Sequence, residues 1–393
     1  MREKPLHGVR VLDLTRLLPG PICTLHLGDM GADVIKVEDT GAGDYVRWQE
    51  PLQVVHSPYF LCLNRNKRSV TLNLRSETGH DIFMSLAKDA DVIVEGFRPG
   101  VVDRLGVGYD SVREINPRIV YCAISGYGQD GPYRLRAGHD VNYCSYAGVT
   151  DQIGVGGGPP VVPNFQIADL LGGGASAAMG ILGALVDAKV SGEGRYVDIS
   201  MTDCTLAHAV IPFTNMLGYG RSLDRGEGFI SGELPCYNIY ETEDGRYMSL
   251  GALEEKFWHM FCDAAGRPDL KEKHIVSGDA AESARAEVAE LFRSQPQSYW
   301  IAVGEEHDCC LAPVLTIAES LENSQLQHRE MFVDTDHPID GPVKQIAFPI
   351  KFSDYQFTVD RHAPGHGEHT AEILSELGYT ADDVEDMKAQ GIV

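Results

Sequence analysis

Apolar residues in the first third of the chain form short continuous runs, separated by stretches such as 22–31 and 79–90 that have the pattern of helices. The runs predict strands at residues 8–14, 32–38, 69–74, 91–96 and 118–125. Strands that are apolar on both faces and alternate with helices are typical of a parallel sheet covered on both sides. We therefore predict an α/β fold with a doubly wound, Rossmann-like parallel sheet, whose ligand lies beyond the carboxyl ends of the strands.

The pattern changes after residue 219. Residues 220–235 have the glycine and charge density of a linker, and residues 236–251 alternate around a Glu-Asp-Gly turn, which predicts a hairpin. Helical patterns follow at 282–294 and 297–303. We predict a large α/β domain of residues 1–219 and 332–393, and a linker with a smaller α+β domain at residues 220–331.

Composition narrows the range of functions. The 393 residues include 57 acidic and 33 basic ones, a net charge of −24, which argues against nucleic acid as a partner because duplex binding needs a basic surface. Nine scattered cysteines without zinc-site spacing, and an N-terminus without a signal-peptide pattern, predict reduced thiols and a cytoplasmic protein. His362, His366 and His369 lie in a loop without an HExxH helix, so we expect no metal.

One carboxylate, Asp169, begins a run that is otherwise small or apolar. Residues 170–186 carry no charge and include five glycines, which predicts a buried helix that other backbones or a ligand can approach closely. About 17 uncharged residues is the lower limit for crossing a bilayer, and the glycines make the run weakly hydrophobic, so we expect no membrane span. Asp169 then has two interpretations, an N-cap of the helix or a partly desolvated reactive carboxylate.

Glycine-rich and basic segments near the predicted strands are the candidates for binding phosphate groups. The first predicted strand is followed by LTRLLPGP rather than GxGxxG, and the glycine-rich stretch 154–160 ends in two prolines, so a dinucleotide site is not expected. Basic residues cluster at residues 64–69, which include Arg65, Lys67 and Arg68, and Arg75 and Arg98 follow apolar strands. These positions are candidates for holding an anionic tail. His139 lies in a turn, where a structural role and a catalytic role both remain open.

Several motifs taken in order resemble a known family. They are GVRVLDLTRLLPGP, LGDMGADVIKVE, NRNKRSVTLNL, DVIVEGFRPG, GYGQDGPY, the Asp169 segment and GHGEHTAEIL. Together they resemble the class III CoA-transferase superfamily over nearly the whole chain. The resemblance implies a coenzyme A thioester as the substrate and an interlocked homodimer. In the transferase branch the residue that matches Asp169 is a nucleophile, which forms an acyl anhydride and then an aspartyl-CoA thioester.

Other segments resemble the α-methylacyl-CoA racemase branch of that superfamily. The segment AGHDVNY implies that His139 is one catalytic base, and Asp169 matches the second. LGALEEKF implies that Glu254 supports the histidine by hydrogen bonding, and HDCCLAPVLT is also similar to the racemase sequence. The coenzyme A contacts that the resemblance implies are Leu72, Asn73, Leu74, Arg75, Ala90, Asp91, Val92, Arg98, Gly138, His139, Asp140, Val141, Asn142 and Tyr143.

The chain departs from the racemases at Asp39, where they have an arginine for the nucleotide part of coenzyme A. Lys36 or the cluster from Arg65 to Arg68 would then supply the positive charge. Coenzyme A would be bound as part of the thioester substrate, and we expect no further cofactor.

Racemisation at the α-carbon of a 2-methylacyl-CoA needs one base on each face of that carbon, one deprotonated and the other protonated. Neutral His139 suits the first role, whereas the pKa of Asp169 must rise for the second. Burial would raise that pKa and helix amides would lower it, and the same amides are expected to hold the enolate oxygen. Asp140 is a weaker candidate than Glu254 for supporting His139.

Two alternatives remain open. Acyl transfer would move coenzyme A to a free carboxylate through covalent Asp169, but it leaves His139 and Glu254 without a role. A non-catalytic protein that binds acyl-CoA would need neither base. The acyl group also stays open among a steroid side chain, a branched fatty acid of lipid metabolism and a short dicarboxylate.

Overall fold

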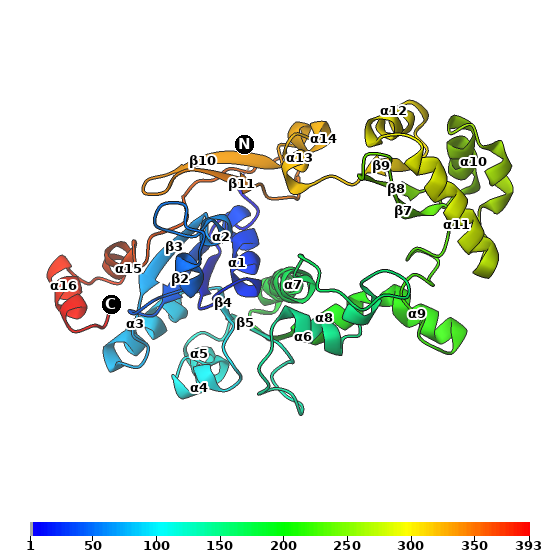
Figure 1. Ribbon diagram of the computed structural model, residues 1–393. Helices are drawn as coiled ribbons and strands as arrows, with labels where there is room; N and C mark the ends of the chain where they lie inside the picture. The colour runs from blue at the N-terminus through cyan, green and yellow to red at the C-terminus, as the bar shows by residue number, and fades with distance from the viewer. Residues whose placement is uncertain (1–2) are drawn as a thin grey trace. The chain divides into compact units, whose positions relative to one another are not determined.

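The computed structural model describes residues 3–393, which divide into two compact units (Figure 1). The larger unit contains the described residues up to Ala147, Asn164–His208 and Gln325–Val393. The smaller unit contains Gly148–Pro163 and Ala209–Ser324, where we expected residues 220–331.

A six-stranded parallel sheet forms the centre of the larger unit, with the strand order β3-β2-β1-β4-β5-β6 (Figure 1). The strands are β1 (Arg10–Asp13), β2 (Asp33–Glu38), β3 (Lys67–Thr71), β4 (Val92–Glu95), β5 (Val120–Ser125) and β6 (Tyr196–Ser200). This confirms the predicted α/β class and the parallel sheet. The order reverses between β1 and β4, and ligands of such sheets bind beside this point, beyond the carboxyl ends of the strands.

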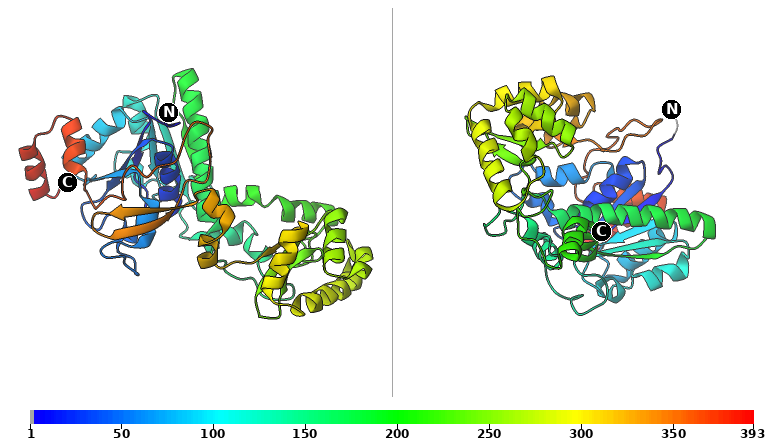
Figure 2. Two further views of the ribbon diagram at one scale, coloured as in Figure 1. Left: turned by 90° about the horizontal axis from the view of Figure 1, so that it is seen from above. Right: turned by 90° about the vertical axis from the view of Figure 1, so that its right-hand side faces the viewer.

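Helices cover the sheet because the side chains of its strands alternate between two apolar faces. On one face Leu12, Ile35 and Ile93 pack in a core with Phe83 and Ile373. The helices of that core are α3 (Glu77–Lys88), α4 (Val101–Arg104), α5 (Tyr109–Ile115), α15 (Thr370–Glu376) and α16 (Ala381–Ala389). The helices α1 (Pro19–Asp29) and α7 (Ser176–Ser191) contact each other and the sheet, and Figure 2 shows α7 as the long green helix beside it.

The predicted helix after Asp169 begins as a π-helix at Ala168–Ala175 and continues as α7. Its glycines allow close packing: a Cβ at Gly173 would collide with Pro19, and one at Gly172 with the backbone of Met201. Within residues 3–393 only Ala168–Ser191 is long and apolar enough to cross a membrane by length and composition, and 44% of an apolar 18-residue window within it is buried inside the protein. The segment contacts α1, β5 and β6, as a core helix does.

The remaining elements of the larger unit frame the sheet. They are α2 (Pro58–Leu63), α6 (Asp140–Tyr146), α8 (Met201–His208), α14 (Ser324–His328) and the antiparallel pair β10 (Phe332–His337) and β11 (Gly341–Ile346). The boundary between the two units falls within α14, after its first residue, Ser324.

The smaller unit contains the antiparallel sheet β7-β8-β9, and its first two strands form the predicted hairpin. Trp258, Phe261, Phe292 and Trp300 pack beneath it as an aromatic core. The elements are α9 (Val210–Tyr219), β7 (Tyr237–Glu241), β8 (Tyr247–Gly251), α10 (Glu255–Ala264), α11 (Gly278–Arg293), α12 (Gln297–His307), β9 (Leu311–Pro313) and α13 (Ile317–Leu321).

Candidate active site

A cavity of about 520 Å³ opens at the carboxyl ends of β1, β4 and β5. Its wall brings together the loop after each of these strands, the turn before α6 and the start of the π-helix. The polar lining residues are Thr15, Arg16, Tyr45, Arg98, Ser125, Tyr127, Arg134, Arg136, His139, Asn142, Tyr143 and Asp169. The cavity therefore lies at the edge of the sheet that the strand pattern predicted for a ligand.

Asp169 lies in the first turn of the π-helix, and its carboxyl group lines the cavity. It does not cap this helix, so the N-cap interpretation is wrong. Asp140 does so instead: its Oδ1 accepts the backbone N–H groups of Ala168 at 2.7 Å and Asp169 at 3.0 Å. Across residues 3–393 no hydrogen bond or ion pair reaches the Asp169 carboxyl group. Burial, and then the nearby charge of Asp140, raise the pKa of Asp169 to about 7.

His139 lines the same cavity from the N-cap position of α6. Its backbone N–H donates to Asn142 Oδ1 at 3.0 Å, which fixes the turn that carries the imidazole ring. Its neighbour Asp140 points to the π-helix, which leaves the support of the imidazole to another group. His139 and Asp169 therefore line one cavity, and the side chain of each is of a type that can accept or donate a proton.

Glu254 belongs to the smaller unit, where it precedes α10 and lies near Cys310. Its predicted hydrogen bond to His139 stays a prediction.

A second cavity of about 740 Å³ contains the predicted coenzyme A contacts Leu72, Asn73, Leu74 and Arg75, directly after β3. Arg16 and Phe97 line both cavities, so the two adjoin at these side chains. The other predicted contacts on the first cavity are Arg98, Gly138, His139, Asn142 and Tyr143; Asp140 and Val141 adjoin them in α6. Ala90, Asp91 and Val92 line neither of these cavities, because they enter β4 at the opposite edge of the sheet.

The predicted cation cluster serves the fold rather than an anionic ligand. Arg65 pairs with Asp29 at 2.6 Å, Lys67 with Asp13 at 3.2 Å and Arg68 with Asp33 at 2.6 Å. All three cations are buried. The expectation that these residues hold the nucleotide part of coenzyme A is therefore wrong, since their charges are already neutralised. The cations on the second cavity are instead Arg16, Arg75 and Arg104, with Arg16 paired to Asp39 at 3.0 Å.

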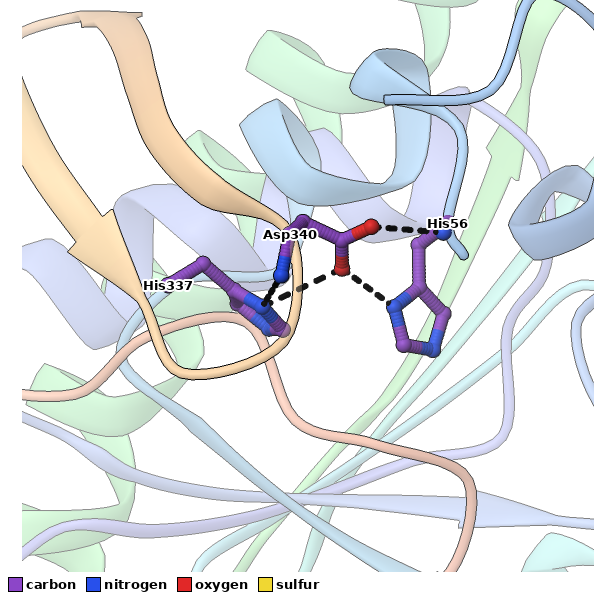
Figure 3. A group of neighbouring side chains, drawn as sticks. All are labelled: His56, His337 and Asp340. Carbon is purple, nitrogen blue, oxygen red and sulfur yellow. Dashed lines mark hydrogen bonds and ion pairs between the residues drawn. The ribbon is translucent and has the colours of Figure 1, made fainter. Parts of the chain in front are cut away.

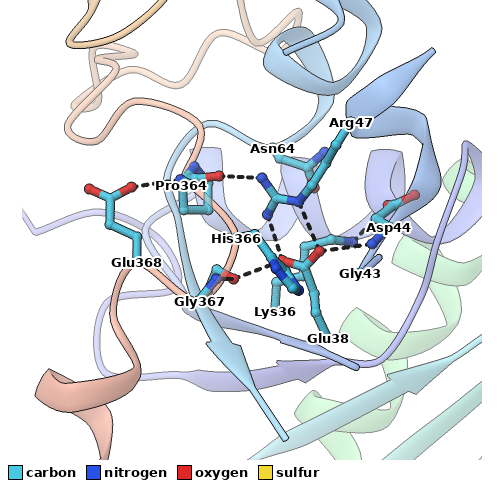
Figure 4. A network of polar contacts seen from close by, with 12 residues as sticks. Lys36, Glu38, Gly43, Asp44, Arg47, Asn64, Pro364, His366, Gly367 and Glu368 are labelled. Atoms are coloured by element: carbon cyan, nitrogen blue, oxygen red, sulfur yellow. Dashed lines mark hydrogen bonds and ion pairs between the residues drawn. The ribbon is translucent and has the colours of Figure 1, made fainter. Parts of the chain in front are cut away.

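Lys36 has a structural role as well, in the buried network of Figure 4. Its Nζ lies 3.0 Å from Asp44 Oδ2 and donates to Thr15 O at 2.8 Å. Asp44 Oδ1 in turn accepts the N–H of Leu17 at 3.2 Å, and Leu17 lines the first cavity with φ at +64°. A leucine in this left-handed region is strained, and such strain is concentrated at functional sites. The buried charges thus hold one wall of the cavity.

Ser125 ends β5 on the floor of the first cavity, and its hydroxyl was not predicted as a site group. The Oγ atom is buried and makes no hydrogen bond within the described chain. A buried hydroxyl without a partner is costly, so a polar group of a bound ligand is the natural partner. The amides expected to hold the enolate oxygen are occupied, because those of Ala168 and Asp169 donate to Asp140 and that of Leu170 to Gln166 O.

His56, His337 and Asp340 form a buried group with metal-ligand chemistry elsewhere in the larger unit (Figure 3). Asp340 Oδ2 accepts from His56 Nδ1 at 2.7 Å. His337 Nδ1 accepts the N–H of Asp340 at 3.0 Å, and its Nε2 donates to Ala363 O at 2.9 Å. These bonds join the three residues to one another and to the backbone of Ala363. Through Asp340 the group connects the turn between β10 and β11 to the loop before α2 by hydrogen bonds.

Comparison with known proteins identifies the class to which this fold and site belong. The model of CoA-transferase family III matches residues 6–370, and the chain belongs to this family. A protein of Fusarium pseudograminearum described as an acyl-CoA transferase is 34% identical over 99% of this chain and 88% of its own. The human α-methylacyl-CoA racemase is 30% identical over 99% of this chain and 97% of its own. The crystal structure of a CAIB/BAIF family protein from Brucella suis superposes with a TM-score of 0.83, at 29% identity over 96% of this chain and all of that one.

Proposed function

We propose that this protein is an acyl-CoA racemase that inverts the α-carbon of a 2-methylacyl-CoA. One observation carries the proposal: Asp169, whose pKa is raised to about 7, shares a cavity with His139. Near neutral pH such a carboxyl group is protonated in a large fraction of molecules, and the imidazole of His139 on the same cavity can accept a proton. A proton donor and a proton acceptor are then present together, as inversion requires.

The reaction proceeds in two proton transfers. Neutral His139 removes the α-proton, and the electron pair of the C–H bond moves into the thioester as an enolate. The protonated Asp169 carboxyl then delivers its proton to the other face of the same carbon. The Ser125 hydroxyl, buried and without a partner, can donate to the bound thioester. The reverse reaction uses the same groups with their protonation states exchanged.

The nucleotide part of coenzyme A is proposed to bind in the second cavity. Arg75 and Arg104 line it, and no carboxylate of residues 3–393 pairs with either side chain. Phosphate groups would satisfy these arginines. The pantetheine arm would then pass Arg16 and Phe97, which both cavities share, and bring the thioester to His139 and Asp169.

Exchange with solvent deuterium tests the proposal. Purified protein is incubated with an (R)-2-methylacyl-CoA in heavy water, and the α-position is followed by NMR while stereochemistry is followed by chiral chromatography. We expect deuterium incorporation together with formation of the S form, and loss of both in the His139→Ala variant. Retention of the α-proton by a protein that binds the thioester would overturn the proposal.

Acyl transfer is the second candidate, favoured by the relative described as an acyl-CoA transferase. In that reaction the Asp169 carboxylate attacks the thioester carbonyl, coenzyme A leaves as the thiolate, and an aspartyl anhydride forms. The thiolate then attacks the aspartyl carbonyl of the anhydride, which releases the donor acid and leaves an aspartyl-CoA thioester. An acceptor carboxylate attacks this thioester and forms a second anhydride with Asp169 as the thiolate leaves, and the thiolate takes the acceptor acyl group and frees the Asp169 carboxylate. Formation of a new thioester on an added acid, unaffected by His139→Ala, would identify this activity.

A homodimer is proposed as the assembly. The helix α9 has no buried residue and exposes Val210, Ile211, Phe213, Leu217 and Tyr219. An apolar helix of this kind is typical of an interface between protein chains. Sedimentation velocity at micromolar concentration is expected to show a dimer, and charged residues in place of Phe213 and Leu217 should weaken it.

A further inference from the structure

Two arginines of the first cavity are not used by the chemistry described above. Arg134 and Arg136 lie in the turn before His139 and line the same cavity. In the described part of the chain neither guanidinium pairs with a carboxylate, although acidic residues exceed basic ones by 24. Both side chains are exposed, whereas a buried arginine of the same unit such as Arg65 is paired. Two exposed cations without acidic partners, on the wall of the cavity that carries His139, can bind an anionic group of a ligand.

Arg136 is also held in position before any ligand binds. Its guanidinium carbon lies 3.8 Å from the ring centroid of Tyr133, and its Nη1 donates to the Tyr146 hydroxyl at 2.9 Å. Tyr127 packs edge-on against both rings, with centroid distances of 5.8 Å and 5.7 Å. The side chain therefore loses little rotamer freedom on binding, and its remaining N–H groups are available to a ligand.

The phosphates of coenzyme A do not account for this pair. The second cavity supplies Arg75 and Arg104 for the nucleotide, and Arg98 lies beside Phe97, where the two cavities adjoin. Arg134 and Arg136 belong instead to the segment that carries His139, five and three residues before it. Their charge is therefore associated with the reacting end of the substrate.

We propose that the acyl group of the substrate carries a second carboxylate, which Arg134 and Arg136 bind. The substrate class is thus a mono-CoA thioester of a branched dicarboxylic acid rather than a neutral fatty acyl or sterol thioester. This inference deepens the proposed function and rests on it for the orientation of the thioester. The pair determines specificity, since neither arginine is needed to move the α-proton.

A difference in binding affinity tests the inference separately from the rate of catalysis. Isothermal titration calorimetry on the full chain compares 2-methylglutaryl-CoA, acylated through the carboxyl group next to the branch, with its ω-carboxamide, which has the same shape and no charge. We expect the acid to bind about 10- to 100-fold more tightly than the amide. Without a local arginine site the net charge of −24 would make the acid bind more weakly than the amide. The presence and the absence of the site therefore predict opposite orders of affinity for the two ligands.

Variants of Arg134 and Arg136 test whether these two residues cause the preference for the acid over the amide. The ratio of the two dissociation constants should fall below about 3 in the Arg134→Gln/Arg136→Gln double variant, and Arg136→Lys should retain part of it. Arg113→Gln is the matched control, since Arg113 also lies near a tyrosine ring, that of Tyr109, but lines neither cavity. It should retain the wild-type ratio. Equal affinities in the wild type, or a preference that survives in the double variant, would overturn the inference. Deuterium exchange decides the racemase proposal separately, so each can fail alone.

Discussion

The Asp140 carboxylate accepts the backbone N–H of Asp169 at 3.0 Å and that of Ala168 at 2.7 Å. The same carboxylate places a like charge near the Asp169 carboxyl group, which adds to the effect of burial in raising its pKa. The charge of Asp140 therefore favours the protonated form of Asp169. Asp140, the residue after His139 in the sequence, thus raises the pKa of Asp169, the second base of the proposed reaction.

The Asp140→Asn variant tests this tuning. The amide oxygen can still accept both N–H groups, but the charge is lost, so the pKa of Asp169 should fall while burial keeps it above its usual value. In the direction where Asp169 donates the proton, activity declines as pH rises through that pKa. The decline should therefore begin at lower pH, with about 3- to 10-fold less activity at pH 7. An unchanged profile of kcat against pH would show that Asp140 only positions the helix.

The ionised side chain of Asp169 should lower the free energy of unfolding of the protein at alkaline pH. Its folded-state pKa of about 7 lies above the ordinary value of 3.8, so its contribution to stability is fully present below pH 4 and is lost as pH rises toward 7. After a discount for partial exposure, Asp169→Asn should stabilise the protein by about 1–3 kcal/mol at pH 8 and have little effect at pH 4. Thermal unfolding at both pH values measures this.

Asp187→Asn provides the control on α7. Hydrogen bonding to Arg195 lowers the pKa of exposed Asp187, so the substitution should give no gain in stability at pH 8. A gain of similar size at both positions would mean that removal of any negative charge on this helix is stabilising, and would contradict the prediction.

Ser125→Ala should separate binding from stability. The Oγ atom is buried without a partner, so its removal should leave the melting temperature unchanged or raise it. Loss of a hydrogen bond to the bound thioester should weaken acyl-CoA binding by about 3- to 10-fold. Ser176→Ala is the matched control, because Ser176 Oγ already donates to Leu171 O at 2.8 Å. That variant should lose stability instead. Tighter binding by Ser125→Ala would exclude the hydroxyl from the site.

Much of the sheet could be predicted from the sequence, because buried parallel strands are continuous apolar runs bounded by turns. The pattern also predicted a ligand site at the carboxyl ends of the strands, and both cavities lie there. The partners of charged residues could not be predicted. Asp13, Asp29 and Asp33 reach the cations of β3 and of the turn before it only through strand pairing and helix packing. A cluster of charges along the chain does not reveal which of them are already neutralised.

The same limit applies to the site. The resemblance to a family singled out His139 and Asp169, but it did not show that Asp140 spans 29 residues to hold the helix of Asp169. Arg134 and Arg136 were visible beside His139, yet only the structure shows that they line its cavity without acidic partners. Ser125 carried no sequence signal, since its significance lies in the absence of a hydrogen bond in the described chain.

Substitution by glutamine should affect stability at Lys67 but not at Arg104, because Lys67 is buried in the fold and Arg104 faces a cavity. Lys67 is fully buried and donates to Asp13, Pro21 O and Asn64, so Lys67→Gln leaves Asp13 without its cation and should cost about 3–5 kcal/mol of stability. Arg104→Gln should instead leave the melting temperature nearly unchanged.

The affinity of the Arg104→Gln variant for coenzyme A should fall about 10-fold, and the dependence of binding on salt concentration should become shallower, because one contact to a phosphate is lost. Calorimetric titration with coenzyme A at two salt concentrations, beside thermal unfolding, measures both effects. If Arg104→Gln bound coenzyme A as the wild type does, the second cavity would not be the nucleotide site, and Arg75 would have no reason to face it unpaired.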